Sequence, residues 1–394
     1  MKLFLFIFTS LYLWACHPLW ARPEYALKTT TVNCNACHLN PFGSGARTIF
    51  GKTYGSFGLK LAPYSKQDLF SADFRAVGYL PQTKKVLTSG FLPMNVQGTL
   101  NAPLSTLVSD DMEDVTPSNL VINFNLSEMN TSPGETFLLV APTEKIQILL
   151  GQFVKPFGLL TDEHRTFVRM QTKTTLMDLE SGVGMAHQLF DTLHIDLSYT
   201  NNTLPSSRFN SEPTWNKLVN LRWTPYSLPI MVGASTSSTE RPSKPDSYAQ
   251  SIYGGISFDR ATDFKVPVTF LLEASRAKGW TAEMTPYTSY FMNTSTDAAF
   301  YNSVIKKTSL GFYGQLIWNL SQRMSVLYKF DQLLLDEKYP ADAFERHGFG
   351  VNYNINSNLI FQVRAEYAQN GRKDLDQTTR SAIDTLFFVL RAWM

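Results

Sequence analysis

The sequence is poor in charge, in cysteine and in long apolar runs, and each shortage excludes a class of protein. Charged residues make up 17% of the 394 residues, below the quarter that is typical of soluble domains. The formal net charge of +2 provides no electrostatic footprint for nucleic acid. Only three cysteines are present, so a zinc site with four cysteine ligands is excluded. Beyond residue 21, no run approaches the ~20 apolar residues that a membrane helix requires.

The N-terminus has the pattern of an export signal. Lys2 precedes an apolar stretch at residues 3–14 that is too short to span a bilayer, and residues 19–21 (LWA) are a candidate cleavage site. An alternative is a lipoprotein signal at residues 13–16, which would leave Cys16 acylated. Cleavage at the first site removes Cys16 and predicts an exported mature chain with two cysteines.

What the sequence has in abundance is alternation of apolar and polar residues. In residues 310–320, Phe312 and Trp318 fall on one face of a strand, whereas Gln315 falls on the other. A period of two residues predicts β-strands with one apolar and one polar face. The same pattern occurs at or near residues 92–100, 119–127, 145–153, 194–200, 216–224, 228–236, 249–258, 266–276, 324–331, 347–355, 359–367 and 385–393.

The alternation fits a soluble β-sandwich or a membrane barrel, and three features favour the barrel. The segments are near the ~10 residues with which a tilted strand crosses a bilayer, and aromatic residues gather toward their ends, as interfacial girdles require. The polar face also carries charges of both signs, which suits a wet lumen. These charged residues are Arg222, Glu273, Lys329, Asp331, Arg364 and Glu366. The sequence therefore predicts an all-β, transmembrane antiparallel β-barrel of about 14–16 strands, surrounded by lipid in the outer membrane of a Gram-negative bacterium.

One connection differs from the other linkers. Residues 156–184 (PFGLLTDEHRTFVRMQTKTTLMDLESGVG) are rich in charge and lack strand alternation. A loop of that length inside a barrel is either functional or disordered. Because such loops often fold inward in water-filled barrels, this connection is a candidate for an element inside the lumen.

Residues 34–38 (CNACH) match the C-x-x-C-H pattern of covalent haem attachment. In that pattern, two thiols add to the two vinyl groups of haem, and the adjacent imidazole lies under the iron. We therefore interpret Cys34 and Cys37 as the thioether anchors of one haem c, and His38 as the proximal ligand. The alternatives are a redox dithiol, which lacks a thioredoxin-like context, and a disulfide, which would crosslink almost nothing.

The second axial ligand of this haem is expected from the barrel, because residues 39–93 contain neither His nor Met. A vacant position, or a Lys or Tyr ligand, stays open as an alternative. The candidate ligands are His164, His187 and His194, with Met170, Met177 and Met185 as thioether alternatives. Arg47 and Lys52 follow the motif and are candidates to pair with the haem propionates.

These observations divide the chain into three parts. Residues 1–21 are the signal peptide, residues 22–88 a monohaem plug segment, and residues 89–394 the barrel. No small helical domain follows the motif, so the barrel would take the place of the usual haem domain. A haem held in its lumen would be shielded from bulk water, and burial and axial ligation would tune its potential.

Residues 21–58 (ARPEYALKTTTVNCNACHLNPFGSGARTIFGKTYGSFG) resemble the N-terminal segment of fused monohaem cytochrome–porins, which include outer-membrane proteins of iron-oxidising bacteria. That family carries a C-x-x-C-H shortly after the signal peptide, then a short Gly/Phe-rich segment and a barrel of about sixteen strands. Residues 151–159 (GQFVKPFGL) look like the strand-end motif of porins, where a strand leads into a loop. The resemblance implies Cys34 and Cys37 as haem anchors and His38 as proximal ligand, and it extends to no other residue.

The motif and the resemblance lead to two main hypotheses of function. The first is an electron-transfer protein of the outer membrane, which connects an extracellular donor or acceptor, such as ferrous iron, to a periplasmic cytochrome or other electron carrier. The alternative is a solute-permeable porin whose haem segment is a plug, sensor or scaffold. A third hypothesis, a membrane-held haem enzyme such as a peroxidase, requires a vacant distal position. Activity of the extracellular iron-oxidase type is left open.

Overall fold

The computed structural model describes sixteen strands, the helix α4 and the turns next to them. The described residues are 70–81, 90–103, 118–125, 135–143, 145–161, 166–172, 174, 178–201, 214–225, 228–240, 246–258, 262, 266–279, 308–321, 323–338, 343–356, 359–370 and 383–393. The haem motif at residues 34–38, with Arg47 and Lys52, and the candidate ligand His164 lie outside these ranges. No helix among the described residues is long and apolar enough to cross a membrane.

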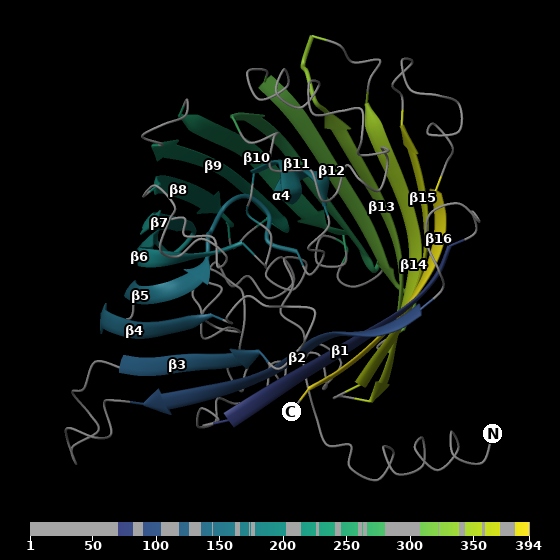
Figure 1. The fold of residues 1–394 in the computed structure, drawn as a ribbon, viewed down its shortest axis with the longest axis horizontal. Coiled ribbons are helices and arrows are strands. Elements are labelled where there is room, and N and C mark those ends of the chain that lie inside the picture. The colour runs from purple at the N-terminus through teal and green to yellow at the C-terminus, as the bar shows by residue number, and fades with distance from the viewer. Residues whose placement is uncertain are drawn as a thin grey trace.

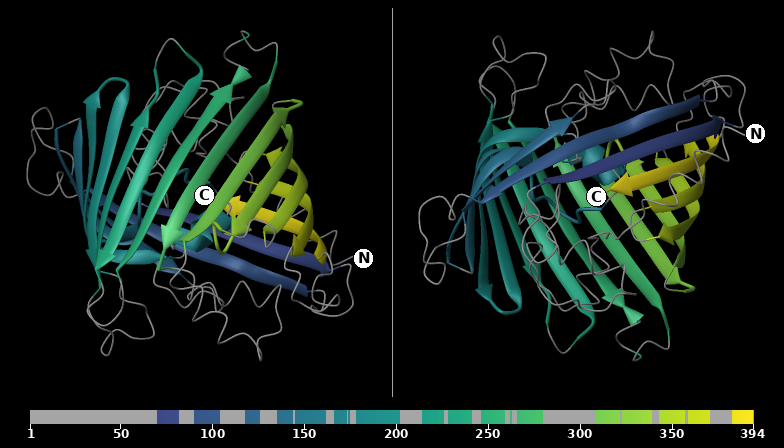
Figure 2. Two further views of the ribbon diagram at one scale, coloured as in Figure 1. Left: turned by 90° about the horizontal axis from the view of Figure 1, so that it is seen from above. Right: turned by 90° about the horizontal axis from the view of Figure 1, so that it is seen from below.

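The strands form one closed antiparallel barrel, in which chain neighbours pair and β1 pairs with β16 (Figure 1 and Figure 2). The predicted all-β antiparallel barrel is confirmed, and its sixteen strands lie at the upper end of the predicted number. Closure leaves no edge strand. An edge strand inside a bilayer would expose unpaired backbone N–H and C=O groups to lipid, which is energetically unfavourable. The strands are β1 (Phe70–Pro81), β2 (Gly90–Pro103), β3 (Ser118–Asn125), β4 (Thr136–Thr143), β5 (Ile146–Val154), β6 (Leu179–Phe190), β7 (Leu193–Asn201), β8 (Trp215–Trp223), β9 (Ile230–Glu240), β10 (Ser247–Ser257), β11 (Val268–Lys278), β12 (Thr308–Asn319), β13 (Met324–Leu334), β14 (Phe344–Asn356), β15 (Leu359–Asn370) and β16 (Ile383–Trp393).

The barrel begins earlier in the chain than the sequence predicts. β1 lies within residues 22–88, which the sequence analysis assigns to the haem segment, so the predicted boundary at residue 89 is wrong. β1 belongs to the wall because it pairs with β2 on one side and with β16 on the other. Its alternation is weak, since Ala72 and Gly78 stand where larger apolar side chains would mark the face of a strand.

The alternation pattern also misses β4 and β6. β4 (TFLLVAPT) is almost continuously apolar over its first half, so it shows no period of two. β6 begins at Leu179, inside residues 156–184, and its lumen-facing positions include Gly182 and Gly184. Glycine adds no side chain to either face, which hides the polar side of the strand. The long connection is therefore shorter than predicted and spans residues 155–178.

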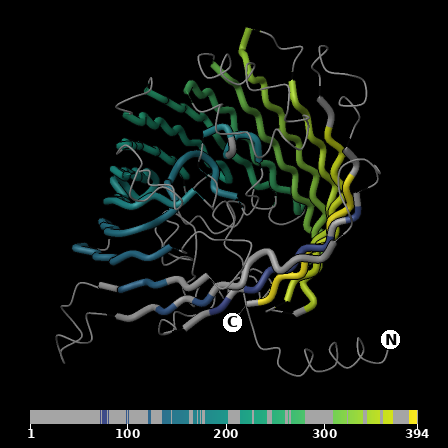
Figure 3. The backbone as a smooth tube through the Cα atoms, viewed as in Figure 1, coloured from purple at the N-terminus to yellow at the C-terminus, as the bar shows by residue number. Residues whose placement is uncertain are grey.

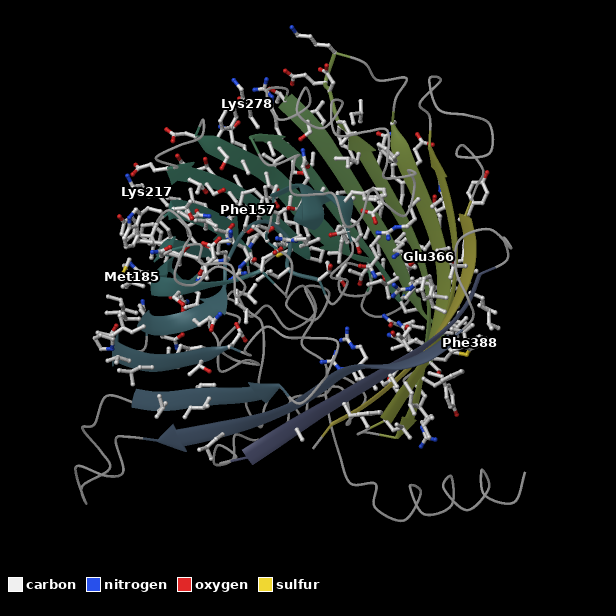
Figure 4. All side chains as sticks on the ribbon, in the orientation of Figure 1. Phe157, Met185, Lys217, Lys278, Glu366 and Phe388 are labelled. Atoms are coloured by element: carbon white, nitrogen blue, oxygen red, sulfur yellow. The ribbon has the colours of Figure 1, made fainter. Side chains whose placement is uncertain are left out.

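The wall has an apolar outer face, and its inner face carries polar side chains on β7–β11 and β13–β15. On β3–β6 the inner face holds an apolar cluster instead, formed by Val121, Phe137, Leu139, Leu149, Phe153 and Ala186. On β8, Val219 and Leu221 point outward and are 37% and 41% exposed, whereas Asn220 between them points inward and is buried. Met185 and Phe388 lie at the outer surface on β6 and β16 (Figure 4). An apolar belt of this extent is unfavourable in water, so we infer that lipid surrounds it and that the barrel spans a bilayer.

The two rims of the barrel differ in the length of their connections. One rim carries short turns such as residues 144–145 and 191–192, with residues 104–117 as a longer exception. The other rim carries long connections, among them residues 155–178 and 279–307. Because long loops of bacterial barrels face the outside and short turns face the periplasm, we call these the periplasmic rim and the outer rim. β1 begins and β16 ends at the periplasmic rim.

Aromatic side chains mark both edges of the belt. Near the outer rim, the rings of Tyr199 and Trp215 stack with their centroids 5.0 Å apart. At the periplasmic ends of β8 and β12, Trp223 and Trp318 point outward and are exposed. Aromatic rings of this kind lie at the boundary between lipid and water. The predicted clustering of aromatic residues toward the strand ends agrees with these positions.

An outward-facing residue in the middle of β10 can test whether the apolar outer face of the barrel lies in lipid. Ile252 is 67% exposed on the outer face, and we predict that Ile252→Lys lowers the free energy of unfolding by about 2–4 kcal/mol, because it places a cation in hydrocarbon. Gln250→Lys, on the same face nearer the outer rim, is the matched control, with a predicted cost below about 1 kcal/mol. Equilibrium unfolding in lipid vesicles measures both costs, and equal values would contradict the assignment of the belt.

Candidate functional site in the barrel lumen

The connection between β5 and β6 turns into the barrel, where α4 lies inside the wall (Figure 3). We call the described residues between 155 and 178 the inner segment. The chain turns inward at Gly158, whose φ of 61° lies in the left-handed region that favours glycine. A Cβ atom at this position would also collide with the carboxylate of Glu273. Residues 151–159 thus form a strand end that leads into a loop, as the porin-like motif predicts.

A buried ion pair holds the root of the inner segment. Lys155 Nζ contacts Glu180 Oε1, and both side chains are almost fully buried. Thr200 Oγ1 donates a hydrogen bond to the other carboxylate oxygen of Glu180 (2.5 Å), and the N–H of Val154 donates one to Glu135 Oε1 (3.1 Å). Because a buried charge is stable only with partners, these contacts fix the point at which the chain leaves the wall.

Apolar side chains of the inner segment pack against the inner wall. Phe157 is fully buried inside the barrel (Figure 4). Its cluster consists of Leu218, Ala249 and Ala277. Leu159 and Val168 belong to a second cluster, whose wall residues are Met231, Tyr253, Leu271, Tyr313 and Ile317. Full burial of one large apolar side chain contributes about 1.5–3 kcal/mol, so packing at three such positions holds the segment on β8–β12.

Glu273, on β11, is the polar centre of the contact between the inner segment and the wall. Its Oε2 accepts a hydrogen bond from the N–H of Leu159 (3.2 Å) and lies 3.4 Å from Arg169 Nη2. Ser251 Oγ donates to Glu273 Oε1 (2.7 Å), and Arg169 also donates to the carbonyl of Phe157. The carboxylate and the guanidinium are both almost fully buried, so each compensates the charge of the other.

The helix α4 (Phe167–Thr172) lies against β11, β12 and β13 (Figure 1). The amide of Gln171 bridges two strands, because its Nε2 donates to Ser309 Oγ (2.8 Å) and its Oε1 accepts from Ser275 Oγ (2.7 Å). The N–H of Phe167 donates to Asp331 Oδ1 (3.2 Å). Side chains of the wall, rather than a backbone ladder, therefore hold the helix in the lumen.

A network of opposite charges covers the inner face of β13, β14 and β15. Lys329 Nζ lies 2.6 Å from Glu366 Oε1, and Arg346 forms an ion pair with Asp331. Arg346 and Arg364 lie 3.8 Å and 3.6 Å from the oxygens of Glu366. The predicted placement of Lys329, Asp331, Arg364 and Glu366 on the lumen face is confirmed. Arg346 also faces the lumen, although the sequence analysis does not single it out.

One candidate haem ligand, His194, points into the lumen near the periplasmic rim. It is 1% exposed, and its Nε2 lies 2.7 Å from Asp196 Oδ1, whose other oxygen accepts from Asn220 Nδ2 (2.8 Å). The Nδ1 of His194 is buried and makes no hydrogen bond to any described residue. Metal-ligating histidines usually have one ring nitrogen held by a carboxylate. The surroundings of His194 therefore fit a metal ligand, and its role toward haem stays a prediction.

The other candidate histidine that the structure describes, His187, does not point into the lumen. It shares the outward face of β6 with Val183 and Met185, whereas Ala186 points inward and is buried. The prediction that it faces the lumen is wrong, because the two-residue period of β6 turns it toward the lipid side. Met185, one of the thioether candidates, also faces the lipid side, because it lies on the same outward face of β6. Among the described residues, no group of three or more His, Cys, Asp or Glu could hold a metal ion.

The sequence analysis misses the charges that hold the inner segment, namely Lys155, Arg169 and Glu180. The signal for Arg169 and Glu180 is the charge content of residues 156–184, which is unusual for a loop next to apolar strands, and Lys155 directly precedes this range. The sequence does not reveal the partner of each charge, since Arg169 meets Glu273 across more than 100 residues of chain.

No protein-family model and no curated protein matches the sequence. Among solved structures, the chain is similar to an anion-selective porin from Comamonas acidovorans (TM-score 0.56, 8% identity, 82% of this chain and 98% of that chain). It is also similar to the outer-membrane channel DcaP of Acinetobacter baumannii (TM-score 0.55, 8% identity, 82% and 96%) and to OmpT of Vibrio cholerae in its trimer form (TM-score 0.54, 10% identity, 82% and 98%). The fold is that of an outer-membrane porin. The porin-like part of the predicted family resemblance is thereby confirmed.

The contact between Arg169 and Glu273 provides a test of how the inner segment is held in this porin fold. Glu273→Gln keeps the shape of the side chain but leaves Arg169 as a buried cation without its anion, a loss worth about 3–5 kcal/mol. We predict that trypsin then cleaves after Arg169 roughly a hundredfold faster or more, because cleavage follows the population of the released segment. Mass spectrometry of the peptides measures the rate.

The matched control for this experiment is Glu337→Gln, which removes the anion of an exposed pair with Arg276 (2.9 Å) at the outer rim. Exposed pairs contribute little to stability, so cleavage after Arg169 should not change. An equal increase in both variants would show that the buried pair does not hold the inner segment.

Proposed function

We propose that this chain is a solute-permeable porin of the outer membrane, in which the inner segment narrows the passage. The observation that supports this proposal is the division of the lumen. The inner segment packs on β8–β13, whereas Arg364, Arg391 and Arg75, on the lumen side of β15, β16 and β1, are partly exposed. A path lined by polar and charged side chains lowers the cost of moving ions and small polar solutes across the bilayer.

The likeness to solved porins supports the same proposal at the level of the fold. The chain covers 96–98% of the length of each of those solved structures. A segment that is held inside by side chains sets the width of the free cross-section without interrupting the ladder of the wall. Small hydrophilic solutes are thus the expected cargo, and large or apolar ones are expected to be excluded.

Conductance in a planar lipid bilayer tests the porin function. We predict stepwise ion conductance for the purified protein, and a larger or less steady conductance for Glu273→Gln, because the inner segment is then released from the wall. Glu337→Gln is expected to conduct like the unmodified protein. The absence of conductance from protein that migrates as a folded barrel on a cold denaturing gel would refute the proposal.

A second function, electron transfer, is favoured by the C-x-x-C-H motif at residues 34–38. We propose that Cys34 and Cys37 bind one haem c covalently, with His38 as proximal ligand and His194 as the second ligand. β1, the first described strand after the motif in the chain, begins at the periplasmic rim, and His194 lies near the same rim. When bound, the haem would supply a reversible one-electron step to a periplasmic carrier.

Absorption spectra test the ligand assignment independently of any electron-transfer activity. We predict a low-spin six-coordinate haem in the unmodified protein and a shift to high spin in His194→Ala, because one axial imidazole is lost. His187→Ala, in the same part of the barrel but on its outer face, is the control and should leave the spectrum unchanged. A haem that stays low-spin in His194→Ala would exclude His194.

Covalent attachment and vectorial transfer require their own experiments. Haem staining of a denaturing gel should be lost in Cys34→Ala together with Cys37→Ala, and its absence in the unmodified protein would end the haem proposal. Liposomes that enclose a redox dye, exposed to an impermeant external donor, then separate electron transfer from solute passage. Conductance with haem present but without dye reduction would leave the porin function alone.

A further inference from the structure

A row of polar side chains crosses the lumen face of β7, β8 and β9 and leads to His194. Asp196, Asn220 and Ser235 are direct register partners on these three neighbouring strands. All three residues are buried, with at most 5% of their surface exposed. Polar side chains that are buried together and bonded to one another act as a single unit, because the loss of one partner leaves the next one unsatisfied.

The row begins at the inner segment and ends at the imidazole of His194. The backbone N–H of Gly158 donates to Ser235 Oγ (2.8 Å), and Ser235 Oγ donates to Asn220 Oδ1 (2.8 Å). Asn220 Nδ2 donates to Asp196 Oδ2 (2.8 Å), and Asp196 Oδ1 lies 2.7 Å from His194 Nε2. A continuous chain of hydrogen bonds therefore links the inward turn of the inner segment to His194.

The direction of the hydrogen bonds at the start of this chain is fixed. A backbone N–H can only donate, so Ser235 accepts from Gly158 and turns its own proton toward Asn220. The amide of Asn220 has one orientation, because its Oδ1 also accepts from Tyr253 Oη (2.7 Å). Its Nδ2 is therefore the atom that faces β7 and donates to the carboxylate there.

The carboxylate of Asp196 in turn fixes the tautomer of His194. An ionised carboxylate can only accept, so the Oδ1 of Asp196 accepts a proton from His194 Nε2. In the neutral ring, the proton is then on Nε2, and Nδ1 keeps its lone pair. This Nδ1 is buried and makes no hydrogen bond to any described residue. A buried acceptor without a partner is unfavourable, so the site suits a ligand that completes it.

We propose that Asp196 and Asn220 are positioning residues for the second axial ligand of the haem. They hold His194 in the Nε2–H tautomer and leave Nδ1 as the atom that binds the iron. The inference rests on the proposed haem function. Partners of this kind orient a ligating histidine and strengthen its bond to the metal. Ser235 extends the support to the inner segment, because it accepts the N–H of Gly158.

Nuclear magnetic resonance of protein labelled at its histidine nitrogens tests the tautomer without haem. The sequence holds six histidines, so the signal of His194 is the one that disappears in His194→Ala. In alkaline buffer, the haem-free chain with Cys34→Ala and Cys37→Ala should show the Nε2–H tautomer. Asp196→Asn should shift His194 toward the Nδ1–H tautomer, because the new amide accepts from Asn220 and donates to Nε2. An Nδ1–H tautomer while Asp196 is present would refute the inference.

Cyanide binding to the ferric haem measures the effect on the ligand. We expect Asp196→Asn to raise the apparent affinity for cyanide ~10–100-fold, because His194 is then displaced more easily. Ser235→Ala should have a smaller effect in the same direction, since the hydroxyl of Tyr253 still holds the amide. Ser237→Ala is the matched control and should leave the affinity unchanged. Ser237 is buried on the same face of β9, and its Oγ makes no hydrogen bond to any described residue.

The outcomes separate this inference from the function on which it rests. Absence of haem from the unmodified protein refutes the proposed haem function, and the tautomer then decides separately whether Asp196 holds His194. A haem that becomes high-spin in His194→Ala, with the same cyanide affinity in Asp196→Asn as in the unmodified protein, refutes the positioning role alone. If Asp196→Asn does not fold, the comparison of Ser235→Ala with Ser237→Ala decides, and equal affinities then refute it.

Discussion

Backbone hydrogen bonding is the constraint on which the rest of this structure depends. Within a bilayer, an unpaired N–H or C=O finds no water, so a wall of strands must close upon itself. Closure brings residues 70–81 into the wall as the partner of both β2 and β16. It also leaves each side chain only two directions, lipid or lumen, and this choice places the apolar belt outside and sets Arg75 beside Arg391 inside.

The lumen that closure creates is divided between two walls with different chemistry. On β8–β13, the inner segment covers the wall, and its buried Arg169 meets Glu273 there, whereas Lys155 meets Glu180 on β6. Burial without a partner would cost several kcal/mol per charge, which is why the contacts are dense there. On β15, β16 and β1, the arginines Arg364, Arg391 and Arg75 are partly exposed. Solute passage is therefore expected on the side that the inner segment leaves uncovered.

The proposed haem and the proposed passage are compatible with each other. His194 and Arg391 both lie toward the periplasmic rim, and so does the beginning of β1, which follows the haem motif in the chain. A haem segment on that side would meet the barrel at the end of the lumen away from the long outer loops. The same barrel could thus hold a redox group near one mouth and still leave a polar path along β15, β16 and β1.

Sequence patterns alone determined the class of this protein, because alternation depends only on neighbouring residues and on the two faces of a strand. They were sufficient for the all-β barrel, for a range of strand numbers that includes the observed sixteen, and for the lumen-facing placement of Glu273, Lys329, Asp331 and Glu366. They failed where local signal is absent, as in β1 and β6, whose small residues conceal the period. His187 and His194 also look alike in the sequence, although they face opposite sides of the wall.

The tertiary structure alone decided which distant residues meet. Arg169 finds Glu273, Gln171 bridges Ser275 and Ser309, and Arg75 comes to lie beside Arg391 from the other end of the chain. Such pairings depend on the register of the closed sheet and on the inward turn at Gly158, which are properties of the whole barrel. No short-range pattern carries that information, because the contacts form between segments that become neighbours only when the sheet closes.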